Sequence, residues 1–268
     1  MKIYLAGTYS QSHYIYDEFM KIFLAGNKPW INDGIYNEQI EKYRPNILES
    51  YYDLRGDDEY YKILRPFFGD FLLDSGAFTF MQGTDKQSNW AEYAKGYANY
   101  IKSNGITKYF ELDLDSLMTI DKVEDLRKLI EDITGIPSIP VWHKSRGLEY
   151  WHRIAEDYRY IAIGGIVSGE IKRNEYKVFH KLLSVAHKAG TKVHGLGFTN
   201  MQGMKEYKFD TVDSTAWLYG NRGGFIYKFN GQYLLKYYQK DKRMKGKAAA
   251  IHNFTEWVKF SKFVESNY

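Results

Sequence analysis

The chain of 268 residues has no cysteine, only 5 prolines and no long uninterrupted apolar run. The absence of cysteine excludes disulfide bonds, thiolate zinc sites, iron–sulfur clusters and a cysteine nucleophile. No stretch approaches the roughly 18–20 apolar residues that a membrane-spanning helix needs. The apolar start gives way to polar residues from Thr8 to His13, which is too early for a signal peptide. We therefore expect a soluble cytoplasmic protein without a membrane partner.

An excess of one charge is also missing. The chain has 37 Lys and Arg against 33 Asp and Glu, which gives a net charge of +4. This charge is too small for the electrostatic field of the whole protein to indicate a nucleic-acid partner. Apolar residues make up 44% of the chain, which is enough for a core of ordinary size. The 25 tyrosines fit both half-buried packing positions and surfaces on which bases stack.

Short apolar runs alternate with segments of helical periodicity. The runs are residues 2–6, 70–73, 107–112, 138–142, 160–163, 191–194 and 208–212, with a weaker eighth at 224–229. Helices are expected over residues 90–103, 123–133 and 176–189. Such alternation predicts βα units around a parallel sheet. Eight strands favour a closed (β/α)8 TIM barrel, and a doubly wound open sheet is the alternative.

The whole chain is expected to form one barrel domain with two additions. Residues 32–66 form a long insertion after the first βα unit, and residues 231–268 form a helical, basic tail. The tail ends in an amphipathic stretch with Phe254, Trp257 and Phe260. The hexapeptides at 2–7 and 21–26 resemble one another, but six residues are too few to indicate duplication.

Carboxylates, glycines and histidines follow the apolar runs, where parallel α/β folds place their active sites. They are Asp74, Ser75, Gly76, Asp113, His143, Gly164, Gly165, His194, Gly197 and Asp213. A single Asp after a strand is often a helix cap or part of an Asx-turn. Three aspartates at one rim would repel each other, so together they indicate a functional role. The glycines either form ordinary turns or allow the backbone to approach a flat or anionic ligand closely. The histidines either pack in the core or contact a ligand. The chain has no tight pair such as His-x-x-x-His, so we expect no metal.

Five of these strand-end motifs, in order, resemble the tRNA-guanine transglycosylase superfamily. They are Asp-Ser-Gly-Ala-Phe at 74–78, Leu-Asp at 112–113, Gly-Gly-Ile-Val-Ser-Gly-Glu at 164–170, Val-His-Gly-Leu-Gly at 193–197 and Val-Asp-Ser-Thr-Ala-Trp at 212–217. The forms at 193–197 and 212–217 are most similar to the phage-type members that exchange guanine for a 7-deazaguanine in DNA. The resemblance implies a TIM-barrel pentosyltransferase that needs no cofactor. If the chain is encoded by a phage, its place is the host cytoplasm.

The resemblance also implies roles for individual residues. Asp213 is the nucleophile that forms a glycosyl-enzyme intermediate, and Asp74 moves protons on the departing and incoming bases. A register shift of three residues would make Asp210 the nucleophile instead. Asp113 hydrogen-bonds the guanine-like edge of the base. Ser75, Gly76, His143, Gly164, Gly165, His194 and Gly197 contribute to the same base-binding site.

Three departures from the family separate this chain from the tRNA enzymes. Without cysteine, their Cys3His zinc site cannot form. The glutamine that ends the first family motif is Thr79 here, and the one expected after the fourth strand is His143. An appended tRNA-binding domain is also missing. DNA is therefore favoured over tRNA as the acceptor, with a 7-deazaguanine such as preQ0 as the incoming base.

The basic residues of the last third of the chain are candidates for contacts with nucleic-acid phosphates. These are Arg222, Lys240, Lys242 and Arg243. A solvated helix face is the alternative interpretation of this basic run. For the chain as a whole, the alternatives to a DNA enzyme are a tRNA-guanine transglycosylase and a barrel enzyme acting on a small phosphorylated metabolite. The sequence leaves the oligomeric state and the nucleotide context open.

Overall fold

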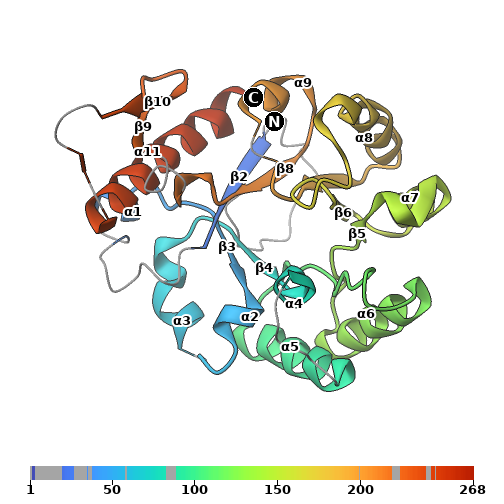
Figure 1. The fold of residues 1–268 in the computed structure, drawn as a ribbon. Coiled ribbons are helices and arrows are strands. Elements are labelled where there is room, and N and C mark those ends of the chain that lie inside the picture. Colours follow the sequence, from blue (N-terminus) through green and yellow to red (C-terminus); the bar gives the residue numbers. More distant parts are fainter. Residues whose placement is uncertain are drawn as a thin grey trace. The chain divides into compact units, whose positions relative to one another are not determined.

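A computed structural model describes residues 2–3, 20–26, 35, 38–57, 59–82, 89–198, 200–218, 224–239, 243–244 and 246–268. The chain divides into two compact units. The first comprises Met1–Leu48, Pro66–Phe71 and Gly197–Tyr268, and the second comprises Glu49–Arg65 and Leu72–Leu196. Each unit combines parallel strands with helices (Figure 1), so the fold class is α/β, as expected.

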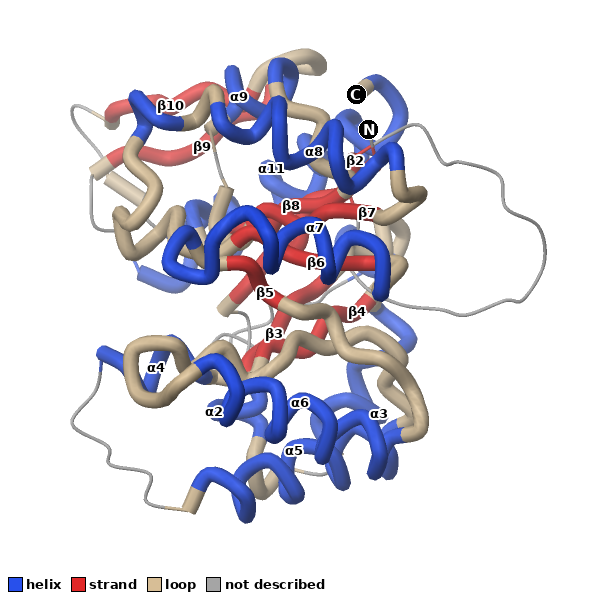
Figure 2. The backbone as a smooth tube through the Cα atoms, turned by 90° about the vertical axis from the view of Figure 1, so that its right-hand side faces the viewer, coloured by secondary structure: helices blue, strands red, loops and turns tan. Residues whose placement is uncertain are grey.

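In the second unit, parallel strands follow one another in chain order. They are the end of β4 (Phe71–Asp74), the bridge residues Tyr109 and Phe110, β5 (Val141–Trp142), β6 (Tyr160–Ile163) and β7 (Lys192–Gly195). Leu73 pairs with Tyr109, Phe110 pairs with Ile139, and β6 lies between β5 and β7 (Figure 2). Because all these pairs are parallel, the carboxyl ends of the strands lie at one edge.

Helices precede β4 and connect the strands that follow it. They are α2 (Tyr51–Leu54), α3 (Tyr60–Leu64), α4 (Ala77–Gln82), α5 (Trp90–Asn104), α6 (Ile120–Thr134), α7 (Gly147–Asp157) and α8 (Val178–Lys188). The expected helices at 90–103, 123–133 and 176–189 are confirmed as α5, α6 and α8. The Asn89 side chain accepts from the amide of Glu92 and caps α5, and Gly105 ends it at a φ of 62°. From α5, the hydroxyl of buried Tyr97 donates to the carbonyls of Leu73 and Phe110 and ties the helix to two strands.

The first unit is built around β2 (Met20–Ala25). This strand pairs in parallel with β1 (Lys2–Ile3), with the start of β3 (Ile47–Ser50) and with β8 (Thr211–Ser214). Ile22, Phe23 and Leu24 are fully buried, as is typical of a parallel strand covered on both faces. The short helices of this unit are α1 (Glu38–Glu41), α9 (Met201–Glu206) and the 3-10 helix η5 (Ala216–Leu218).

The chain ends in a β-hairpin and a long helix. β9 (Phe225–Phe229) pairs antiparallel with β10 (Leu234–Tyr238), and β9 lies along α11 (Gly246–Asn267) in Figure 1. The ring of Tyr227 packs edge-on against Trp257 with 5.4 Å between centroids. Phe254, Trp257 and Phe260, the apolar residues of the expected amphipathic stretch, are buried in α11, and so are the polar residues Thr255, Glu256 and Ser261.

Three expectations about the strands were wrong in part. Residues 32–66 were expected as an insertion, yet they contain β3, a parallel strand of the sheet. The run 224–229 was expected as an eighth barrel strand, but β9 pairs antiparallel in a separate hairpin. The tail was expected to be helical from residue 231, and residues 234–238 form a strand before α11 begins.

Two further expectations concern the fold as a whole. The closed (β/α)8 barrel remains a prediction. The parallel strands within each unit are consistent with it. Within the part of the chain that the structure describes, none of the helices combines the length and the apolar character needed to cross a bilayer.

Candidate active site

The strand ends of the second unit place the predicted site residues near one edge of the sheet. Asp74 is the last residue of β4, Asp113 follows the bridge residue Phe110, and His143 follows β5. Gly164 comes directly after β6. Because the strands are parallel and in chain order, these residues lie at corresponding levels, as their positions after apolar runs predicted.

His143 forms the centre of a charged cluster. Its Nε2 lies 3.0 Å from Oδ2 of Asp113, and its Nδ1 lies 3.1 Å from Oε2 of Glu170. A third carboxylate, that of Asp115, is 3.9 Å from Nε2. With a carboxylate at each ring nitrogen, both nitrogens act as donors, so the geometry fits a protonated imidazolium.

Two glycines make room for this cluster. A Cβ built on Gly164 would lie 2.6 Å from Cε1 of His143, and one on Gly165 would lie 2.6 Å from Oε2 of Glu170. Gly165 also has a φ of +78°, where a side chain is strained. We predicted that these glycines leave room for a flat base. The structure shows that they leave room for the protein's own His143 and Glu170.

The charges of the cluster shift the pKa values of its members. Burial alone would lower the pKa of His143, but its hydrogen bonds to Asp113 and Glu170 and the charges of Asp113 and Asp115 raise that pKa to about 10. The hydrogen bond from His143 lowers the pKa of Glu170 against the effect of burial. Burial raises the pKa of Asp115, but hydrogen bonds and charge from Arg146 outweigh it and lower that pKa.

The shift at His143 predicts a dependence of stability on pH. A pKa raised from the ordinary histidine value of 6.5 to about 10 stabilises the folded state fully below about pH 6.5, and this contribution is lost as the pH rises through 10. We expect the free energy of unfolding of the wild type to exceed that of His143→Gln at pH 6, with the difference shrinking steadily up to pH 10. Urea unfolding at several pH values measures it.

The matched control is His152→Gln, which removes an exposed histidine of α7. The stability of this variant should follow the wild-type pH curve. A difference between wild type and His143→Gln that stays constant from pH 6 to 10 would contradict the assignment of an imidazolium to His143.

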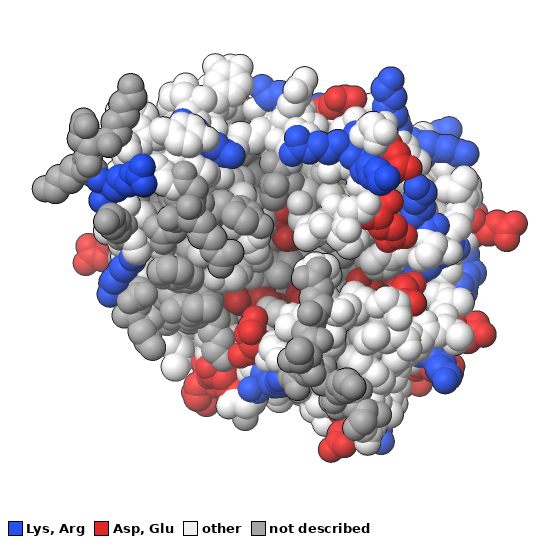
Figure 3. All heavy atoms as spheres, in the orientation of Figure 1, with Lys and Arg blue, Asp and Glu red and all other residues white. Residues whose placement is uncertain are grey.

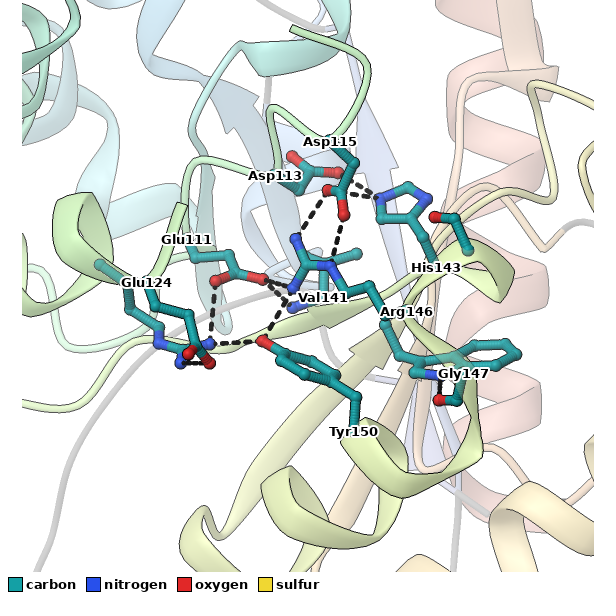
Figure 4. Close-up of polar contacts among 12 residues, drawn as sticks. Glu111, Asp113, Asp115, Glu124, Val141, His143, Arg146, Gly147 and Tyr150 are labelled. Carbon is teal, nitrogen blue, oxygen red and sulfur yellow. Dashed lines mark hydrogen bonds and ion pairs between the residues drawn. The ribbon is translucent and has the colours of Figure 1, made fainter. Parts of the chain in front are cut away.

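A buried ionic network lies beside the cluster (Figure 4). The carboxylate of Glu111 is fully buried and accepts from the amide of Val141 at 2.7 Å and from Nη1 of Arg146 at 2.7 Å. The side chain of Arg146 is 1% exposed. Its guanidinium also donates two hydrogen bonds to the carboxylate of Asp115, from Nε at 2.6 Å and from Nη2 at 2.7 Å. Arg146 thereby holds Glu111, which follows the bridge residue Phe110, and Asp115 in one arrangement.

A second arginine completes the network. Arg127 of α6 donates to Oε2 of Glu111 at 3.1 Å, to Glu124 at 2.7 Å and to the hydroxyl of Tyr150 at 2.8 Å. Arg146 donates to the same hydroxyl at 2.9 Å. The network thereby joins α6, α7 and the segment that carries Asp113.

The sequence analysis missed this network. Its one visible signal is Glu111, an acidic residue inside the apolar run 107–112. A carboxylate that is buried in a strand needs cationic or hydrogen-bonding partners, so its presence predicts buried cations nearby. The positions of Arg127 and Arg146 in the chain do not mark them as these partners.

Asp74 and its neighbours form a tight turn at the end of β4. Oδ2 of Asp74 accepts from the amide of Gly76 at 2.9 Å, and the hydroxyl of Ser75 accepts from the amide of Ala77. Gly76 has a φ of +83°, and a Cβ there would lie 2.6 Å from Cβ of Tyr52. Within this unit, Asp74 makes the Asx-turn that the sequence offered as the alternative to a catalytic role.

His194 of β7 lies inside the second unit. It is fully buried, and its ring packs 5.1 Å from that of Phe110. Its Nδ1 is 3.4 Å from the hydroxyl of Tyr160. These contacts correspond to the packing role that the sequence analysis left open for this histidine.

In the first unit, Asp213 of β8 is nearly buried, with 9% of its surface exposed. Its Oδ1 accepts a short hydrogen bond from the amide of Gly197. This bond brings together two predicted site residues from separate motifs. Whether Asp213 meets Asp74 and Asp113 in one pocket remains a prediction, because those two residues belong to the second unit.

Of the predicted phosphate-binding residues, Arg243 is described and is exposed, while Arg222, Lys240 and Lys242 lie outside the described residues. Nζ of Lys236, on β10, lies 4.9 Å from the ring of Phe225. Over the described parts of the chain, no group of three or more His, Asp and Glu residues is arranged to hold a metal ion.

Comparisons with known proteins leave the family open. No family model matches the chain, and no curated protein matches it. A solved structure described as "QR15, an Aldolase" has 13% sequence identity and a TM-score of 0.45, covering 75% of this chain and 90% of that chain. Similarity at this level assigns neither a family nor an activity to the chain.

Proposed function

We propose that this protein is a transglycosylase that exchanges guanine in nucleic acid, with DNA favoured, for a 7-deazaguanine. In this proposal the strands of both units close into a (β/α)8 barrel. The observation that carries the proposal is the bond between Asp213 and Gly197. It joins two of the five motifs by which the sequence resembles the superfamily, and it orients the carboxylate to which that resemblance gives the nucleophilic role.

The chemistry needs two successive displacements at C1′ of the target nucleotide. A carboxylate oxygen of Asp213 attacks C1′, the bond to N9 of guanine breaks, and the departing base takes a proton from Asp74. The incoming 7-deazaguanine then gives the proton at N9 to Asp74, and its N9 attacks C1′ and releases Asp213. Two inversions give retention, as in retaining glycosidases. The target nucleotide must leave the duplex, because stacking hides C1′ and the base edges.

The charged cluster supports a base-binding role in this scheme. Asp113 is the residue expected to accept hydrogen bonds from the guanine-like edge, and it lies 3.0 Å from Nε2 of His143. Because Arg146 and Glu111 fix the segment around Asp113, this carboxylate is preorganised before any base binds. Asp113 therefore needs little rearrangement to receive the base.

The alternative of a phosphorylated small metabolite is supported less well. A phosphate at the glycine pair would need free amides and no negative charge nearby. The amide of Gly164 already donates to the carbonyl of Trp142 at 2.8 Å. The carboxylate of Glu170 occupies the space beside Gly165 and would repel an anion.

The test is base exchange on defined substrates. DNA or tRNA carrying radiolabelled guanine is incubated with the purified protein and an excess of preQ0 or unlabelled guanine. We expect enzyme-dependent release of label from DNA, and nucleoside analysis should then show the deazaguanine in the polymer. Release from tRNA alone would favour the tRNA enzyme. No release from either polymer, with any of these bases, would contradict the proposal.

A further inference from the structure

The terminal hairpin presents an exposed aromatic strand. Leu234 of β10 is buried, and the four residues that follow it are exposed. The exposed fraction is 50% for Leu235, 60% for Tyr237 and 66% for Tyr238. Contiguous exposed apolar patches commonly mark binding surfaces.

The register of the hairpin assigns these side chains to two faces. Directly opposed residues of an antiparallel pair lie on the same face. Tyr238 faces Phe225 across the hairpin, and their rings lie 5.6 Å apart on the side that carries buried Phe225. Tyr237 pairs with Ile226, and Leu235 pairs with Lys228, so these four residues share the outer face.

The hairpin is anchored to α11, beside which β9 lies (Figure 1). At the edge of β9, the amide of Tyr227 donates to Asn253 at 2.8 Å, and that of Phe229 donates to Glu256 at 2.7 Å. Both acceptors belong to α11. The backbone of β9 is thus anchored by the helix.

The hairpin strands themselves carry positive charge. Residues 224–239 contain Lys228 and Lys236 and no acidic residue. Of the described cations, Lys228 lies diagonally to Tyr237 on the outer face, where the two side chains are within reach of each other. Figure 3 shows Lys and Arg side chains in blue on the part of the surface where Figure 1 places the hairpin.

We propose that the outer face of the β9–β10 hairpin binds unpaired nucleotides of a single-stranded nucleic acid. A base stacks on the ring of Tyr237, and Lys228 contacts a neighbouring phosphate. The identity of the ligand rests on the proposed function, which requires a nucleic acid with locally unpaired bases. The surface itself is argued from the exposure of Tyr237, the register and the charge.

A second copy or another protein adding a strand to β10 fits the surface less well. Lysines along an edge strand are a common protection against such pairing. Lys236 sits within β10, and Lys228 of the partner strand lies on the outer face. An apolar partner on that face would bury Lys228 without a countercharge, whereas a phosphate would supply one.

The test measures the affinity for a fluorescently labelled 15-nucleotide oligo(dT) by anisotropy. We expect Tyr237→Ala to weaken binding about tenfold, because one stacking contact is lost, and Tyr237→Phe to bind within about twofold of the wild type. Lys228→Ala should reduce the salt dependence of log Kd by about one unit of slope. The matched control is Tyr233→Ala, which removes an exposed tyrosine whose ring already packs on Lys205, 4.9 Å away. This variant should bind like the wild type.

Heparin, a polyanion without bases, separates stacking from charge. Tyr237→Ala should bind heparin as the wild type does. Equal losses for heparin and oligo(dT), or no loss for either, would overturn the inference. So would a wild-type dimer in sedimentation that Tyr237→Ala dissociates, since that result assigns the surface to a second copy.

The inference and the proposed function fail in different ways. Oligo(dT) binding that depends on Tyr237, in a protein that exchanges no base, would remove the proposed function and leave the inference standing. Base exchange in Tyr237→Ala with unchanged kcat and unchanged KM for the polymer would remove the inference alone.

Discussion

Replacing Asp213 by asparagine is expected to slow base exchange at least about a thousandfold while the protein stays folded. The amide cannot form the glycosyl ester, so the double displacement stops at its first step. Asparagine has nearly the same size and keeps an oxygen that accepts from the amide of Gly197. The measurements are the initial rate of label release from DNA and the melting temperature of the variant.

Asp210→Asn is the matched control, because a shift of three residues would make Asp210 the nucleophile. The backbone carbonyl of Asp210 accepts from the amide of Lys21, a bond that the substitution leaves in place. We expect Asp210→Asn to retain most of the activity and to form a covalent adduct with DNA that survives denaturation. An active Asp213→Asn together with an inactive Asp210→Asn would transfer the nucleophilic role to Asp210.

Replacing Glu111 by alanine is expected to destabilise the protein by about 3–5 kcal/mol. The carboxylate of Glu111 bonds to both Arg127 and Arg146, and all three side chains are buried. Its removal leaves two guanidinium groups with less countercharge and the amide of Val141 without its acceptor. Urea unfolding measures the loss, and Glu111→Gln provides a milder change of the same shape if the alanine variant does not fold.

Asp132→Asn is the control for this prediction. It breaks the ion pair with Lys128 on α6, where both side chains are largely exposed. Exposed pairs contribute little, so we expect a change below about 1 kcal/mol. A loss of similar size in Glu111→Ala and Asp132→Asn would mean that the buried network does not hold the second unit together.

Apolar runs predicted several of the strands, although the run that forms β2 was not among those expected. Residues 160–163 are such a run, and they form β6 with the expected bounds. β3 escaped notice because only its first two residues are apolar. Its third, Glu49, is buried because its carboxylate accepts from the hydroxyl of Tyr60 at 3.0 Å. Hydrophobic periodicity does not register a strand that buries a paired carboxylate.

β10 was missed for a different reason. Its sequence, Leu-Leu-Lys-Tyr-Tyr, lacks the strict alternation of apolar and polar residues that marks a half-buried strand, and it lies in a segment that was expected to be helical. Its conformation follows from pairing with β9, which is held by side chains of α11. The side chains that anchor β9 therefore come from positions 26 and 27 residues further along the chain than the amides they accept from.

For the candidate site, the sequence indicated which residues follow the strands but not what they contact. His143 and Glu170 were both visible in the motifs, and the 3.1 Å contact between them joins residues 27 positions apart. Such contacts depend on the register of β5 with β6, which short apolar runs leave undetermined.

Gly164 and His143 occupy what is in effect one shared volume. The space that a methyl group would need at position 164 is filled by the imidazole from position 143 and by a methyl group of Val141. These positions are therefore not free to change independently. In any descendant of this chain, a larger residue at 164 requires a smaller or displaced one at 143, and that change would leave Asp113 and Glu170 facing each other without the cation between them. Adding one carbon atom at position 164 would thus alter the balance of charges in the whole cluster.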